Sequence, residues 1–235
     1  MDIVLIPGFW LDASSWDSVA PGLRDAGHTV HPITLPGLES LDADRSGIGL
    51  RDHVDAVVSL VDSLAGSDGT RVVLVGHSGG GAVAHAVADA RPEAIARVVY
   101  VDSGPLGHGD WINDELPVVD GEIPLPDWSV FDDEDLVDLD ETLRESFRAR
   151  AIPQPLGVAA DKQVLSDPRR YEVPVTLIAC EFSSDLLRDW MAQGHPYVAE
   201  LGRISSVELV DLPTGHWPQF TKPRELTEAI LAAVE

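Results

Sequence analysis

The sequence is poor in cysteine and in long apolar runs. Its 235 residues include a single cysteine, Cys180, so no disulfide can form within the chain and nothing indicates an oxidising compartment. No apolar run approaches the roughly 18 residues that a membrane-spanning helix needs. Residues 1–8 lack a basic segment and are typical of a β-strand rather than of a signal peptide. We therefore expect a cytoplasmic protein.

Positive charge is also scarce. Lysine and arginine number 16 against 40 aspartate and glutamate residues, which gives a formal net charge of -24 at pH 7. A surface of this sign repels nucleic-acid phosphates and anionic lipid headgroups, so we expect neither nucleic acid nor a membrane as a partner. The hydrophobic fraction of 44% is that of an ordinary globular protein and predicts a folded chain. We expect it to be a monomer or a homodimer.

Metal-binding patterns are missing as well. The sequence has no H-E-x-x-H motif and no cluster of cysteine and histidine, and its acidic residues lack the spacing of an EF-hand. We therefore expect no metal and no cofactor.

Short apolar runs alternate with amphipathic stretches along the chain. This pattern predicts an α/β fold with a mostly parallel, six-stranded sheet flanked by helices. The expected strands are 2–6, 29–35, 71–75, 97–102, 173–180 and 207–211, and the expected helices are 16–26, 51–64, 82–90, 134–150, 186–201 and 223–234. Residues 104–171 break the pattern and are rich in proline, tryptophan and acid, so we expect a single domain over 1–235 with an inserted helical lid at about 104–171.

The strongest local signal is the segment Gly-His-Ser-Gly-Gly at residues 76–80. It fits G-x-S-x-G and stands between an expected strand and an expected helix, the context in which this motif presents a serine nucleophile. Ser78 is therefore the predicted nucleophile. The backbone N–H of Gly79, together with that of Phe9 in the loop after the first strand, is expected to form an oxyanion hole.

A serine nucleophile needs a base, and His216 is the best placed of eight histidines. It lies between the last expected strand and the last expected helix. Because the carboxyl ends of parallel strands meet at one edge of a sheet, this loop emerges beside Ser78. His85 falls within the helix after Ser78 and is expected to be a packing residue, and His77 occupies the variable position of the motif.

The order of these features resembles the α/β-hydrolase superfamily over nearly the whole chain. The opening Gly8-Phe9-Trp10, followed by Trp16, is similar to small esterases related to plant methylesterases and hydroxynitrile lyases. Pro7 departs from that family, which usually has histidine there. The resemblance implies a serine hydrolase that cleaves a carboxylic ester or lactone of a small, largely apolar substrate through an acyl-enzyme.

The third member of the catalytic set has several candidates. Many relatives carry the acid just after the strand that corresponds to 173–180, where this chain offers Asp185 and, less favourably, Glu181. Asp102 stands at the end of the preceding strand, a position that other members of the superfamily use. We favour Asp102, with Asp185 as the alternative. Its role is to hold the imidazole tautomer and to stabilise the imidazolium.

Aromatic side chains are candidates for the substrate pocket. Trp10, Trp111 and Trp128 are expected to shape it.

Two other interpretations stay open. The same fold can serve a lyase, a perhydrolase or a cyclisation pocket. Residues 79–84 also fit G-x-G-x-x-A, with Asp102 about 20 residues further on, as in a dinucleotide-binding oxidoreductase, although no Tyr-x-x-x-Lys pair is present.

Overall fold

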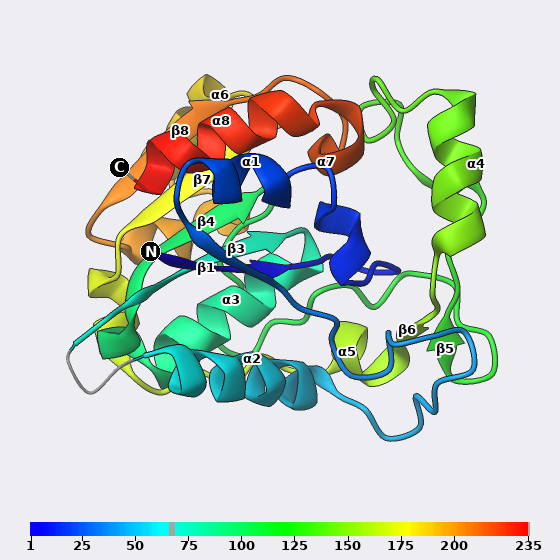
Figure 1. Ribbon diagram of the computed structural model, residues 1–235, viewed down its shortest axis with the longest axis horizontal. Coiled ribbons are helices and arrows are strands. Elements are labelled where there is room, and N and C mark those ends of the chain that lie inside the picture. Colours follow the sequence, from blue (N-terminus) through cyan, green and yellow to red (C-terminus); the bar gives the residue numbers. More distant parts are fainter. Residues whose placement is uncertain (66–68, 235) are drawn as a thin grey trace.

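The computed structural model describes residues 1–65 and 69–234 and contains a six-stranded sheet (Figure 1). Its strand order is β2-β1-β3-β4-β7-β8, and every neighbouring pair is parallel. These strands are β1 (Asp2–Ile6), β2 (Thr29–Pro32), β3 (Val72–His77), β4 (Ile95–Val101), β7 (Val175–Ala179) and β8 (Val207–Asp211). A short antiparallel pair, β5 (Glu122–Ile123) and β6 (Gln154–Pro155), stands apart. The predicted fold class is confirmed.

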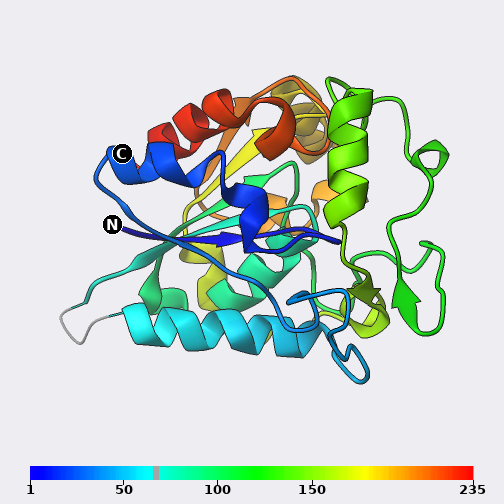
Figure 2. The same ribbon diagram turned by 45° about the vertical axis from the view of Figure 1, so that its right-hand side comes forward.

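Helices cover both faces of the sheet. The α-helices of the described residues are α1 (Ala20–Asp25), α2 (Leu50–Leu64), α3 (Gly79–Ala90), α4 (Glu141–Arg150), α5 (Leu156–Ala160), α6 (Ser184–Gln193), α7 (Pro218–Thr221) and α8 (Pro223–Val234). Helices α2 and α3 lie on one face, and α1 and α8 lie on the other (Figures 1 and 2). Among the described residues, we find no helix with the length and apolar character that a bilayer crossing requires.

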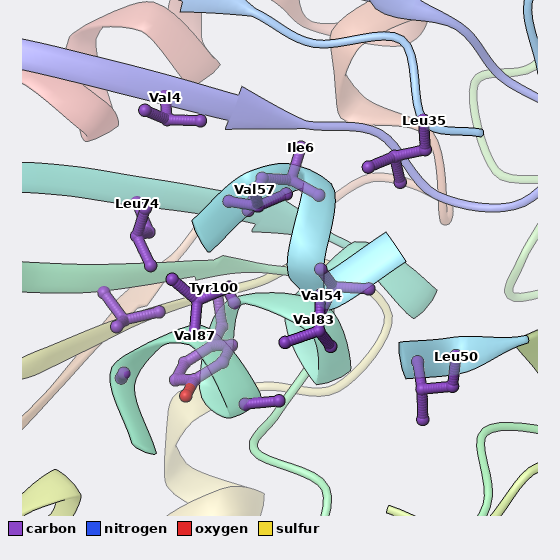
Figure 3. Close-up of a cluster of buried hydrophobic side chains, with 14 of the residues drawn as sticks. Val4, Ile6, Leu35, Leu50, Val54, Val57, Leu74, Val83, Val87 and Tyr100 are labelled. Atoms are coloured by element: carbon purple, nitrogen blue, oxygen red, sulfur yellow. The ribbon is translucent and has the colours of Figure 1, made fainter. Parts of the chain in front are cut away.

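The core has one cluster on each face because the central strands carry apolar residues at most positions. Alternate residues of a strand point to opposite faces, so a continuous apolar run fills both sides. On the side of α2 and α3, the strand residues meet aliphatic helix residues, as Figure 3 shows for Val4, Ile6, Leu74, Val54, Val57, Val83 and Val87. On the opposite side, Ile3, Leu5, Val73 and Val75 pack with Leu23, Leu226 and Ile230.

Several predicted element boundaries are wrong, and capping residues explain them. The helix expected over 134–150 begins only at Glu141, because the carboxylate of Asp140 accepts the N–H of Leu143 and caps it there. The helix expected over 186–201 ends at Gln193, since Gly194 takes the left-handed conformation with φ 66°.

Two predicted boundaries in the N-terminal part of the chain also differ from the structure: the start of a helix and the end of a strand. The helix expected over 16–26 begins at Ala20, after a separate 3₁₀ turn, Ala13–Trp16. The strand expected over 29–35 ends at Pro32, although the Ile33 N–H still donates to the Leu5 carbonyl of β1 at 3.1 Å. This strand lies at the edge of the sheet, where a proline is tolerated.

The segment expected to form a lid, residues 104–171, contains β5, β6, α4 and α5. In both views α4 and the β5–β6 pair lie beyond the carboxyl ends of the strands (Figures 1 and 2). Two hydrogen bonds attach this segment to the loop after β1: the Trp10 indole N–H donates to the Ile123 carbonyl at 3.0 Å, and the Ile152 N–H donates to the Trp10 carbonyl at 3.0 Å. The segment therefore borders the edge where the predicted site residues emerge.

Candidate active site

Ser78 occupies a strained turn between β3 and α3. Its φ of 51° and ψ of -127° lie in a region that side chains rarely adopt. The turn is tight enough to require glycine on both sides: a Cβ on Gly76 would lie 2.5 Å from the Gly80 carbonyl oxygen, and one on Gly80 would lie 2.6 Å from that of Pro7. This geometry presents the serine hydroxyl at the N-terminus of α3, where backbone N–H groups favour negative charge.

His216 connects Ser78 to Asp102. The imidazole Nδ1–H donates to Asp102 Oδ2 at 2.7 Å, because a carboxylate can only accept, and this leaves Nε2 to accept from the Ser78 hydroxyl at 2.8 Å. Asp102 directly follows β4, and His216 lies in the loop between β8 and α7. The parallel sheet thus brings together three groups that are far apart in the sequence.

Asp102 is held rigidly against His216. It has a φ of 44°, and its Oδ1 accepts the backbone N–H groups of Cys180 at 3.0 Å and of Glu181 at 3.1 Å. Burial opposes its ionisation, but the hydrogen bond from His216 and the charge of that ring keep the pKa of Asp102 below its usual value. The side chain is 7% exposed.

Asp185, the alternative acid, is not part of this cluster. Its side chain is 92% exposed on α6 and pairs with Arg188 at 2.9 Å. The structure therefore corrects the Asp185 alternative: the first turn of α6 points this carboxylate into solvent and away from His216.

Glu181, the least favoured candidate, does reach the imidazole. Its Oε1 lies 2.8 Å from His216 Nδ1, and its side chain is 13% exposed. Burial, together with repulsion from Asp102, raises the pKa of Glu181 to about 8. Burial opposes protonation of His216, yet the hydrogen bond to Asp102 and the contact with Glu181 outweigh it and raise the pKa of the ring.

The predicted oxyanion donors lie next to Ser78. Gly79 is the first residue of α3, and the loop after β1 runs so close that a Cβ on Gly8 would lie 2.8 Å from Ser78 Cβ. The Phe9 ring packs over Gly79, with its nearest carbon 2.7 Å from where a Cβ would stand. The structure thus brings Phe9 and Gly79 to the serine.

His77 holds the His216 loop, a role that was not predicted from the sequence. This fully buried ring donates its Nε2–H to the His216 carbonyl at 2.7 Å, and Gln219 donates to its Nδ1 at 3.3 Å. Burial lowers the pKa of His77 to about 3, so the ring stays neutral and keeps this tautomer. The signal lay within the motif itself, at its variable position.

The predicted lid segment also contacts the His216 loop. The carbonyl of Asp135 accepts the His216 N–H at 2.8 Å, and that of Val137 accepts the Gly215 N–H at 3.0 Å. A Cβ on Gly215 would lie 2.7 Å from the same Val137 oxygen, which explains the glycine before His216.

The three tryptophans do not line the pocket that reaches His216. Trp10 is buried with its indole bound to Ile123, Trp128 packs edge-on against Trp217, and Trp111 is 39% exposed with the Lys162 ammonium 3.2 Å from its ring centroid. The pocket and the open solvent at its mouth together occupy about 480 Å³. It is lined by Asp102, Glu181, His216, Ser103, Gly104, Pro105, Leu177, Ala179, Phe182, Leu187, Tyr197, Val198 and Leu201.

A metal at the site would have to displace a proton, and a dinucleotide has no room there. Asp102, Glu181 and His216 offer three possible ligand atoms within 4.8 Å of one another, but the Nδ1 proton already lies between His216 and Asp102. The glycines of a dinucleotide fingerprint are covered by protein: Gly79 by Phe9, Gly80 by the end of β1 and Gly81 by Ser103. A pyrophosphate would need the space that these groups fill.

The strained serine turn and the Ser78–His216–Asp102 chain agree with a comparison to protein families. A family model described as the alpha/beta hydrolase family matches residues 3–229. The chain belongs to this family.

Named relatives of this alpha/beta hydrolase are esterases and hydrolases. A carbendazim hydrolyzing esterase from Nocardioides sp. (strain SG-4G) is 27% identical over 257 residues, which cover 98% of each chain. Methylesterase 7 from Arabidopsis thaliana is 35% identical over 102 residues, which cover 42% of this chain and 38% of that protein. These relatives support an ester hydrolase.

Solved structures give the same fold. An extracellular alpha/beta-hydrolase from a Paenibacillus species superimposes with a TM-score of 0.78 at 22% identity, covering 99% of this chain and 98% of that one. Tomato methylketone synthase I gives a TM-score of 0.74 at 20% identity, covering 99% and 97%. The fold therefore extends over the whole alpha/beta hydrolase chain.

Proposed function

We propose that this alpha/beta hydrolase is a serine esterase that cleaves a carboxylic ester or lactone through an acyl-enzyme. The observation that carries the proposal is the continuous hydrogen-bonded chain from Ser78 through His216 to Asp102, at 2.8 and 2.7 Å. Hydrogen-bond contact between a hydroxyl and a base, with a third group orienting that base, is the arrangement that activates a serine.

The first half of the reaction forms the acyl-enzyme. His216 Nε2 takes the hydroxyl proton as Ser78 Oγ bonds to the carbonyl carbon, and the Asp102 carboxylate stabilises the imidazolium. The backbone N–H groups of Phe9 and Gly79 hold the oxyanion of the tetrahedral intermediate. The bond to the alkoxy oxygen then breaks, and His216 returns its proton to that oxygen so that an alcohol leaves.

The second half releases the acid. A water gives its proton to His216 Nε2 and attacks the acyl carbon, and the Ser78 oxygen leaves with that proton. The products are a carboxylic acid and an alcohol, or one hydroxy acid from a lactone, with Ser78 and His216 restored.

The surroundings of Ser78 favour a small apolar substrate. The Phe9 ring and an Ile112 methyl group lie within 2.7 and 3.6 Å of the position that a Cβ on Gly79 would take. Apolar walls of this kind bind substrate through buried area, while a few polar groups fix its orientation. The names of the relatives, carbendazim hydrolyzing esterase and pyrethroid hydrolase, also indicate organic substrates of modest size.

Labelling and turnover test the proposal together. A fluorophosphonate should label Ser78, and aryl esters of increasing acyl length and lactones should be hydrolysed at rates that fall by at least about 10³-fold in Ser78→Ala. Equal labelling of wild type and Ser78→Ala would contradict the serine nucleophile. Labelling of Ser78 without hydrolysis of any ester or lactone would instead favour non-hydrolytic use of the same site.

A further inference from the structure

Two carboxyl groups compete for one proton on His216. Asp102 Oδ2 lies 2.7 Å from Nδ1 and Glu181 Oε1 lies 2.8 Å from it, but Nδ1 carries a single hydrogen. That hydrogen is directed to Asp102 in the hydrogen-bonded geometry. Glu181 Oε1 is buried and has no hydrogen bond of good geometry from the described residues, despite its short distance from the ring.

The donors around the two carboxyls are unequally shared. Asp102 accepts the His216 Nδ1–H on one oxygen and the backbone N–H groups of Cys180 and Glu181 on the other. These three hydrogen bonds stabilise its ionised form. Glu181 pairs with no lysine or arginine among the residues that the structure describes; its ion pair is with His216. A negative charge on Glu181 would thus be stabilised by the imidazolium alone.

The groups that face Glu181 from the packed elements are largely acidic. Asp102 comes from the end of β4, Asp135 from the segment before α4, and His216 from the loop after β8. Tyr197 lines the same pocket, and the charges of Asp102 and Glu181 help to raise the pKa of its hydroxyl. These acidic neighbours disfavour a second carboxylate here.

We propose that Glu181 is a positioning residue that is protonated beside the ionised Asp102 at low pH and ionises at high pH, so that the base His216 faces one negative charge at low pH and two at high pH. The proposal rests on the assignment of His216 as the base. An oxygen of Glu181 and one of Asp102 lie within 4.8 Å of each other, beside the same ring nitrogen. The pocket beside Glu181 and His216 lets solvent exchange the Glu181 proton.

The consequence is a displaced pH profile. As pH rises, Glu181 loses its proton, and the second negative charge holds the proton on His216 more tightly. The neutral imidazole that can accept the Ser78 proton then forms at a higher pH than one carboxylate would require. A charge at this distance shifts a neighbouring pKa by about 1–3 units.

The test measures the rate of Ser78 phosphonylation by a fluorophosphonate against pH, which needs no knowledge of the natural substrate. Glu181→Gln keeps the shape of the protonated acid and cannot ionise. We expect the phosphonylation rate of this variant to rise with pH (the rising limb of the profile) about one pH unit or more below the pH at which the wild-type rate rises. The plateau rates of the two proteins should agree within about threefold. Asp185→Asn, which removes an exposed negative charge four residues away, is the matched control and should leave the limb in place.

Three alternative results of this experiment would each contradict a different part of the proposal. Coincident limbs for wild type and Glu181→Gln would show that the Glu181 charge does not act on His216. A loss of about 10³-fold at every pH in Glu181→Gln, with Asp102→Asn near wild type, would make Glu181 the triad acid instead. Absence of Ser78 labelling in wild type would overturn the proposed function and this inference with it. Urea unfolding of each variant confirms that it is folded.

Discussion

Replacing Asp102 by asparagine gives the sharpest test of the His216 orientation. In the native site Oδ1 accepts two backbone N–H groups, from Cys180 and Glu181, and Oδ2 accepts the His216 Nδ1–H. The asparagine amide has one oxygen and one NH₂, so the two backbone donors fix its oxygen and turn its NH₂ toward Nδ1. His216 must then accept at Nδ1 and carry its proton on Nε2, where Ser78 needs an acceptor.

The size of the effect follows from that tautomer. With Nε2 protonated, the ring cannot take the hydroxyl proton, and the charge that stabilises the imidazolium is also lost. In a serine triad a change of this kind lowers kcat by about 10⁴-fold, or roughly 5.5 kcal/mol of activation free energy. Folding should suffer less, because asparagine matches aspartate in shape and keeps the backbone hydrogen bonds; we expect a loss of about 1–3 kcal/mol.

Steady-state hydrolysis of an aryl ester gives kcat and KM, and urea unfolding gives the stability of the same variant. We expect Asp102→Asn to lower kcat by about 10³–10⁴-fold while KM changes little. Asp185→Asn serves as the control and should retain full activity, since Asp185 is exposed and faces Arg188. An Asp102→Asn enzyme within about tenfold of wild type would refute the tautomer argument.

Three further predictions concern the surroundings of the site. His77→Phe removes the donor to the His216 carbonyl and should lower kcat by about 10–100-fold with little change in KM; an unchanged kcat would show that the loop holds its place without it. Burial opposes ionisation of Glu200, but hydrogen bonds from His85 and Arg170 outweigh the effect of burial and lower the pKa of Glu200 to about 2. The ionised form of Glu200 therefore stabilises the fold above pH 4.5, and this stability is lost as the pH falls toward 2. Urea unfolding of Glu200→Gln should therefore show a loss of about 3 kcal/mol at pH 7 and less than half of that at pH 3, and equal losses would contradict the linkage. Excess EDTA should leave esterase activity unchanged, whereas a loss restored by added Zn²⁺ would point to a metal at Asp102 and His216.

The sheet and the serine turn could be predicted because their signals are local. A run of apolar residues such as 72–75 can be satisfied only by burial on both faces, and the glycines around Ser78 permit a backbone that few other residues tolerate. Helix ends were harder to predict, because periodic apolar residues continue past the real boundary. Asp140 and Gly194 set those ends through a single cap or a left-handed residue.

The sequence by itself determined where Ser78 and His216 lie, because each follows a strand whose carboxyl end must reach the same edge of a parallel sheet. Only the tertiary structure decided among Asp102, Asp185 and Glu181. All three stand near a strand end, so their order in the chain does not distinguish them. What distinguishes them is the direction of each side chain: Asp102 and Glu181 point to His216 Nδ1, and Asp185 points to solvent. Direction depends on the backbone of two neighbouring strand ends at once, and no local pattern encodes that.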